Sequence, residues 1–78
     1  MRSDTLRARL KKDLEDLLKR KVVVEFCNLG RSHEVEVIPD DPEYLGPELI
    51  FRGDYPFAKL CEAAYATVAF LEDIKLKE

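Results

Sequence analysis

Apolar residues recur at helical spacing in the first part of the chain, where the pattern predicts a helix from about Asp4 to Arg20. Ser3 or Asp4 is expected to cap its first turn, because a side-chain oxygen there accepts a hydrogen bond from a free backbone N–H. The repeating apolar positions are Leu6, Leu10, Leu14, Leu17 and Leu18. A single stripe of this kind predicts an amphipathic helix that buries one face.

The apolar period then changes to every second residue. Val22 to Cys27 and His33 to Ile38 are rich in β-branched and aromatic residues, which is typical of strands. Asn28 to Ser32 supplies the asparagine and glycine that a tight turn favours, so an antiparallel hairpin is predicted. Glu34 and Glu36 are predicted to face water. The positions predicted to share the core face are Val22, Val24, Phe26, Val35 and Val37.

Residues Pro39 to Pro47 contain three prolines and several acidic residues, and they predict a surface loop. A third short strand, Glu48 to Arg52, follows with Leu49 and Phe51 on one face. It is predicted to stop at Gly53.

A second helix is predicted from about Pro56 to Asp73, with Asp54 or Tyr55 as its cap and with the residues after Asp73 frayed. Its predicted sheet-facing stripe is Phe57, Leu60, Cys61, Ala64, Val68 and Leu71. The chain therefore predicts one α+β domain over residues 1–78, in the order helix, β-hairpin, strand, helix (αβββα). Two helices packed against a three-stranded antiparallel sheet would bury both stripes.

The other side of this second helix is apolar as well. It carries Ala63, Ala66, Phe70 and Ile74, and the nine residues from Ala63 to Leu71 include no charge. An exposed apolar patch on a small domain usually marks an interface, so these four residues are predicted to contact another chain. The alternative is that the first helix covers them within the same chain. The prediction is a non-catalytic protein-interaction module, a homo-oligomer (dimer) or a binder of another protein.

Size and composition are consistent with this interpretation. A chain of 78 residues has a marginal core, and oligomerisation is a common remedy. Two cysteines are too few for a disulfide-stabilised secreted domain and fit a reducing compartment. No apolar run reaches the length of a membrane helix, and we expect a cytoplasmic protein without membrane contact.

Charge is unevenly distributed along the chain. Residues 1–21 hold eight basic and four acidic side chains, whereas residues 22–78 hold five basic and twelve acidic ones. Opposite charges four residues apart are expected to neutralise the basic helix and leave a solvated face. The predicted pairs are Arg9–Asp13, Lys11–Glu15, Lys12–Asp16, Glu15–Lys19 and Asp16–Arg20.

The order of elements resembles the double-stranded-RNA-binding domain over about Asp4 to Asp73. Gly30-Arg31-Ser32-His33 also resembles that family's glycine-to-histidine spacing in the first hairpin loop. The resemblance implies an alternative function, a nucleic-acid-binding domain that uses the basic N-terminal helix. The family's lysine cluster at the start of the second helix has no counterpart here, where Lys59 is the one lysine near Gly53-Asp54-Tyr55-Pro56-Phe57.

The sequence contains few residues in patterns typical of catalysis, metal binding or phosphate binding. Cys27 and Cys61 are expected to be buried apolar residues, and His33 is expected to lie at the surface. Together they lack the short paired spacing of a zinc site. No serine lies in a nucleophile context, and three glycines form no phosphate-binding loop. We predict no enzyme activity, no cofactor and no metal. A thiol-based redox or metal protein is the remaining, third hypothesis.

Overall fold

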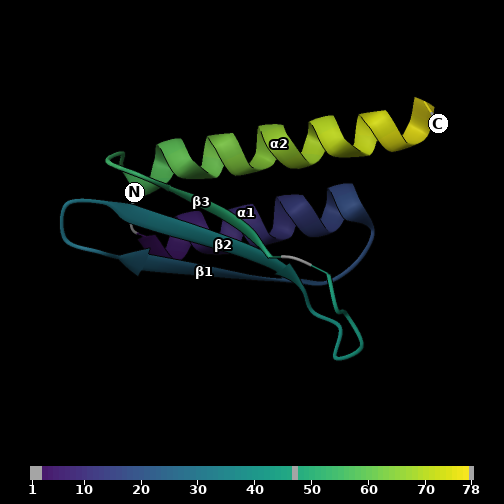
Figure 1. Cartoon of the computed structure of the whole chain (residues 1–78), viewed down its shortest axis with the longest axis horizontal. Helices are drawn as coiled ribbons and strands as arrows, with labels where there is room; N and C mark the ends of the chain where they lie inside the picture. Colours follow the sequence, from purple (N-terminus) through teal and green to yellow (C-terminus); the bar gives the residue numbers. More distant parts are fainter. Residues whose placement is uncertain (1–2, 47, 78) are drawn as a thin grey trace.

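The elements follow the predicted order. The computed structural model describes residues 3–46 and 48–77, so Pro47 of the predicted loop lies outside the described residues. The elements are α1 (Ser3–Leu18), β1 (Val22–Asn28), β2 (His33–Pro39), β3 (Leu49–Gly53) and α2 (Phe57–Lys77), as Figure 1 shows.

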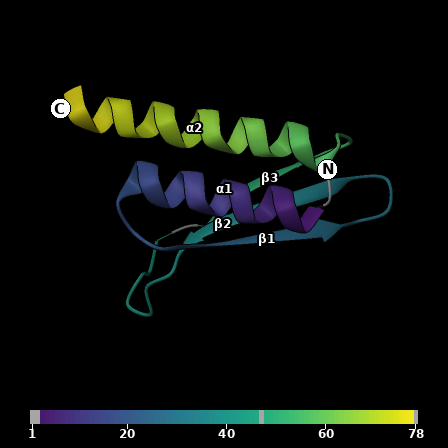
Figure 2. The same ribbon diagram turned by 180° about the vertical axis from the view of Figure 1, so that it is seen from behind.

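The three strands form one antiparallel sheet in the order β1-β2-β3. Both described helices cover the same face, and the sheet lies in front of α1 in Figure 1 and behind it in Figure 2. The register places Phe26, Val35 and Phe51 in one row across the sheet, all facing the helices. The predicted fold class is confirmed.

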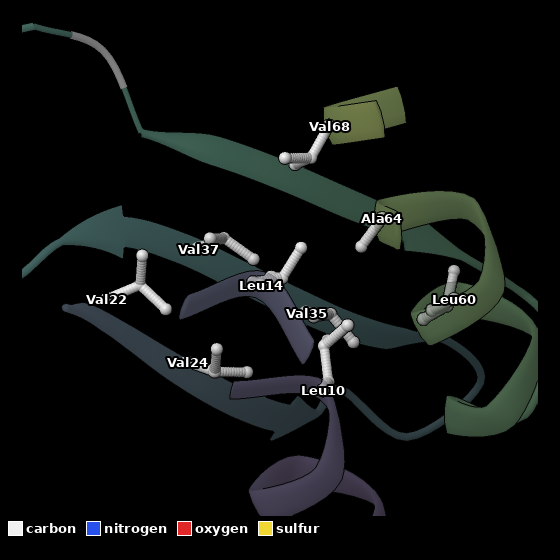
Figure 3. Packing of buried hydrophobic residues seen from close by; sticks show 9 residues of the cluster. All are labelled: Leu10, Leu14, Val22, Val24, Val35, Val37, Leu60, Ala64 and Val68. Atoms are coloured by element: carbon white, nitrogen blue, oxygen red, sulfur yellow. The ribbon is translucent and has the colours of Figure 1, made fainter. Parts of the chain in front are cut away.

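The core lies between the sheet and the two helices. Leu14, Val22 and Val35 are completely buried. The buried cluster is completed by Leu10, Val24, Val37, Leu60, Ala64 and Val68, and Figure 3 shows these side chains pointing toward one another from α1, β1, β2 and α2. The predicted apolar faces of helix and hairpin therefore meet. Neither described helix is long and apolar enough to cross a membrane.

The hairpin turn is built by two residues with special geometry. The Asn28 side-chain oxygen accepts a hydrogen bond from the Gly30 backbone N–H at 3.0 Å. Gly30 has a φ of 89°, a conformation that costs glycine little because it lacks a Cβ atom. The Leu29 N–H donates to the Ser32 carbonyl at 2.9 Å and closes the turn.

The first helix ends earlier than its leucine pattern predicts. It stops at Leu18, because Lys19 adopts a left-handed φ of 57° and turns the chain toward β1. One Glu15 oxygen accepts hydrogen bonds from the Lys11 ammonium at 2.7 Å and from the Val22 backbone N–H at 3.1 Å. A single carboxylate thus joins the helix to the first strand.

The second helix differs from its prediction at both ends. The Pro56 carbonyl accepts the first hydrogen bonds, from Lys59 at 3.0 Å and Leu60 at 3.3 Å, so Pro56 precedes the helix instead of Asp54 or Tyr55. The helix continues to Lys77 rather than fraying after Asp73. No glycine or proline interrupts this last stretch, and residues 72–77 are mostly good helix formers.

Candidate interaction surface

The four residues predicted as an interface all lie exposed on one side of α2. We call Ala63, Ala66, Phe70 and Ile74 the outer face. Phe70 is 63% exposed and Ile74 is 38% exposed. The sheet-facing side of the same helix is occupied by other residues, Leu60, Ala64 and Val68, which are buried.

The first helix does not cover the outer face. It meets α2 on a different side, where Leu6 and Leu10 of α1 line a shallow cleft together with Cys61 and Tyr65 of α2. The alternative, in which α1 of the same chain covers the outer face, is therefore not found among the described residues. What α1 contacts is the flank of α2 that carries the half-buried Cys61 thiol.

The C-terminal end of α2 projects beyond the sheet, as Figure 1 shows. Leu71, which the pattern placed on the sheet-facing stripe, is 41% exposed, and Leu76 is 87% exposed. Leu71 lies on the sheet-facing side as predicted, where it lines a groove together with Val37 and Leu49, but it is not buried. This end of the molecule consequently presents large apolar side chains in addition to Phe70.

A groove opens beneath this projecting end. It has a volume of about 580 Å³ and lies between the C-terminal ends of α1 and α2 and the adjoining end of the sheet. We call it the end groove. Its apolar wall includes Val22, Val37, Leu49, Val68, Leu71 and Ile74, and its rim carries Arg20, Glu72 and Lys75. The helical periodicity of the sequence could not predict this groove, because the groove is also lined by Tyr44 from the proline-rich loop.

The face of the sheet away from the helices, the open face, concentrates acidic residues. Glu25 and Glu36 lie directly opposite each other on β1 and β2. Like charges in such cross-strand positions are destabilising. In the next row Glu34 stands between Cys27 and Arg52, and the Arg52 Nε donates to a Glu34 oxygen at 2.8 Å.

The prediction that Glu34 faces water is wrong. It lies on the open face as the alternation requires, but it is only 7% exposed because it belongs to the central strand and has neighbours on both sides. The Arg52 hydrogen bond lowers the pKa of the Glu34 carboxyl, against the opposing effect of burial. The hydrogen bond between Glu36 and Glu34 raises the pKa of the Glu36 carboxyl. Burial and the nearby charges of Glu48, Glu34 and Glu25 raise this pKa further.

Glu36→Gln is expected to stabilise the protein at pH 7. The pKa of Glu36 is raised by folding, so its ionised form opposes folding at neutral pH. This cost disappears as the pH falls through the raised pKa and then through the ordinary value. The glutamine amide donates to Glu34 at every pH. Urea unfolding should therefore show a higher midpoint for the variant at pH 7 and a much smaller difference near pH 4.

Glu62→Gln is the matched control, because Glu62 is an exposed carboxylate on α2 away from the open face. A lower unfolding midpoint for Glu36→Gln at pH 7 would contradict the prediction. The comparison must be between variant and wild type, since the lowered pKa values of Glu34 and Glu15 make the wild-type protein lose stability on acidification.

The cysteines and the histidine lie in three separate environments. Cys27 is on β1 as predicted, but it is exposed on the open face instead of buried. Cys61 is half-buried, and burial raises the pKa of its thiol. His33 is also half-buried: its Nδ1 lies 2.8 Å from the Tyr55 carbonyl and its ring packs edge-on against Phe57. Within residues 3–46 and 48–77 no group of potential ligands is arranged for a metal ion.

The basic helix is less neutralised than its sequence predicts. Of the five predicted pairs, all between described residues, Lys11–Glu15 is formed at 2.7 Å and the other four are not formed. Arg20 lies outside the helix and approaches Asp41 of the loop at 3.6 Å. Arg9 and Lys12 remain exposed and make no ion pair with any described residue.

No protein family, curated protein or solved structure matches the chain. The order of elements shared with the double-stranded-RNA-binding domain is a resemblance of layout, and a layout alone does not carry function.

Proposed function

We propose that the protein is a non-catalytic, cytoplasmic interaction module that pairs with a second copy of itself through the outer face of α2. The observation that carries the proposal is the exposure of Phe70, at 63%, within a stretch of α2 from Ala63 to Leu71 that contains no charged residue. A contiguous apolar patch on a small soluble domain usually marks a protein contact.

The energetics favour pairing. Burial of a phenylalanine side chain contributes about 1.5–3 kcal/mol, and a core of this size rarely supplies more than about 3–5 kcal/mol. The small side chains of Ala66 and Ala63 lie about one and two turns before Phe70 on the same side of α2, and they would let a second helix approach closely. Pairing through this face would therefore add a large fraction of the stability of one chain.

The cysteines support the cytoplasmic part of the proposal. Cys27 and Cys61 are both free and stand in different layers, Cys27 on the open face and Cys61 on the flank of α2 that faces α1. Free thiols, one of them exposed, are typical of proteins in a reducing compartment.

The test is the mass of the native protein at rising concentration. Gel filtration with light scattering should show a species of twice the 9.0 kDa chain mass, in a proportion that increases with concentration. A chain that stays at 9.0 kDa up to millimolar concentration would contradict self-association.

A second function is favoured by the exposed charges of α1. Arg9 and Lys12 are available for phosphate contacts, in keeping with the nucleic-acid alternative. Affinity for a short RNA duplex that falls steeply with added salt would support this alternative, because phosphate contacts release counterions. The self-association proposal expects neither the affinity nor the salt dependence.

A further inference from the structure

The outer edge of β3 carries backbone groups that bond to no other strand. β3 is the last strand of the sheet, so one of its edges pairs with β2 and the other pairs with no described residue. Residues of an antiparallel strand bond alternately to its two sides. The hydrogen bond from the Asp40 N–H to the Lys21 carbonyl sets this alternation, which leaves the N–H and C=O groups of Ile50 and Arg52 on the outer edge. Such an edge is a template for a strand of another chain.

The sequence along this edge is self-complementary. Residues 48–52 read Glu-Leu-Ile-Phe-Arg. When two copies run antiparallel about Ile50, Glu48 of each copy stands opposite Arg52 of the other. In the same register Leu49 stands opposite Phe51, and Ile50 stands opposite itself. Opposite charges and large apolar side chains in directly opposed positions stabilise an antiparallel pair. Each of the five positions therefore gains a suitable partner from a second copy.

The outer face of α2 adjoins the same edge. A groove of about 450 Å³ between α2 and β3 is lined by Ile50, Phe51 and Arg52, and also by Ala63 of the outer face. It lies on the side of α2 away from α1, which packs against the other flank of the helix. The β3 edge and the outer face can therefore belong to one contact.

We propose that two copies pair through the outer edges of their β3 strands, antiparallel about Ile50, and form one continuous six-stranded sheet. The inference rests on the proposed self-association and extends it from the outer face to the sheet. A two-fold axis uses the same surface of both copies. The outer face alone is small, because an interface buries about 800 Å² on each partner and a large aromatic side chain contributes only about 150–250 Å². Strand pairing supplies further area.

The spacing of the helices fits this pairing. α2 packs on β2 and β3. Its axis therefore lies about one strand spacing, ~4.8 Å, from a two-fold axis at the outer edge of β3. Two copies would hold their α2 helices about 10 Å apart, and packed helices lie about 8–10 Å apart. The two outer faces thus come into contact when the strands pair.

The position of the axis along the helices fits as well. Ile50 lies level with the part of α2 between Ala63 and Val68, because its neighbours in β3 line grooves with these two residues. An axis at Ile50 consequently passes close to the middle of the outer face. The two helices run antiparallel, so Phe70 of each copy lies beside Ala63 of the other, a large side chain against a small one.

Glu48 and Arg52 are available for the contact. The Arg52 side chain is 62% exposed, although its Nε donates to Glu34. Glu48 is exposed and forms no ion pair with any described residue. It lies close enough to repel the Glu36 carboxylate. An arginine from the second copy beside Glu48 would offset this repulsion.

The first test is a disulfide between two copies at the proposed axis. Ile50→Cys is combined with Cys27→Ser and Cys61→Ala, so that each chain holds one thiol. The Cα atoms of residue 50 in the two copies would lie about 5.5 Å apart, within the range that a disulfide spans. Mild oxidation should give a species of twice the 9.0 kDa chain mass on a non-reducing gel.

Glu25→Cys in the same background is the matched control. Glu25 is exposed on the same open face, but it belongs to β1, the strand at the opposite edge of the sheet. Its chain should give no linked species above background, and circular dichroism should show the same fold for both proteins. Equal linkage through residues 25 and 50 would contradict pairing through β3.

An affinity measurement separates this inference from the proposed function. Glu48→Lys should raise the dimer dissociation constant about 10-fold, because each dimer exchanges two attractive pairs for two repulsive ones. Glu43→Lys makes the same change of net charge in the loop before β3 and should leave the constant unchanged. A dimer that Phe70→Glu dissociates, but that Glu48→Lys leaves intact and Ile50→Cys does not link, would overturn the strand pairing alone. A monomeric wild type would overturn both.

Discussion

Leu14→Ala is expected to unfold most of the protein at 25 °C. Leu14 is 0% exposed and lies in the core between α1 and the sheet, as Figure 3 shows. Removing a fully buried leucine side chain costs about 2–5 kcal/mol, since a cavity remains where the side chain was. A domain of this size has about 3–5 kcal/mol to lose. Far-ultraviolet circular dichroism and urea unfolding at fixed protein concentration measure the change.

Leu45→Ala is the matched control for this substitution. Leu45 is 96% exposed in the loop between β2 and β3, and its truncation should change the free energy of unfolding by less than about 0.5 kcal/mol. If Leu14→Ala lost no more than Leu45→Ala, the position of the core between helix and sheet would be incorrect.

Phe70→Glu is expected to raise the dimer dissociation constant by more than about 100-fold. The substitution removes about 1.5–3 kcal/mol of apolar burial and also places a carboxylate in a contact without a partner, where about 1.4 kcal/mol corresponds to tenfold in affinity. The fold should survive, because Phe70 is 63% exposed in the single chain. Light scattering reports the mass and circular dichroism reports the fold.

The control is Leu29→Glu, which introduces the same charge at an exposed apolar residue of the hairpin turn. It should leave the dimer intact. If Phe70→Glu unfolded the chain, Phe70 would belong to the core. A Phe70→Glu protein that stayed dimeric would place the contact on another surface.

The sheet and its register were largely predictable, because alternation in a hairpin specifies which residues share a face. Val24 and Phe26 face the helices as predicted. The same alternation also places Cys27 on the open face, so the sequence contained the signal for its exposure. The expectation of a buried thiol gave more weight to residue type than to position in the strand.

Other features depend on residues that meet only in the folded chain. Glu34 is buried because Arg52, eighteen residues further along, pairs with it across the sheet. The end groove likewise requires Leu18, Val37 and Tyr44 to converge from a helix, a strand and a loop. No repeating pattern of apolar residues within one helix or strand indicates such contacts between distant residues. The outer face of α2 was the exception, since the absence of charge from Ala63 to Leu71 indicated it directly.

The strand order has a kinetic consequence. Each strand pairs with its neighbour along the chain, so the sheet assembles by closing short loops, at a small cost in chain entropy. The packing of α1 against α2 joins the two ends of the sequence. That contact closes the longest loop and is expected to form late in folding. A nascent chain would then carry a finished sheet with α1 in place before α2 arrives to complete the core.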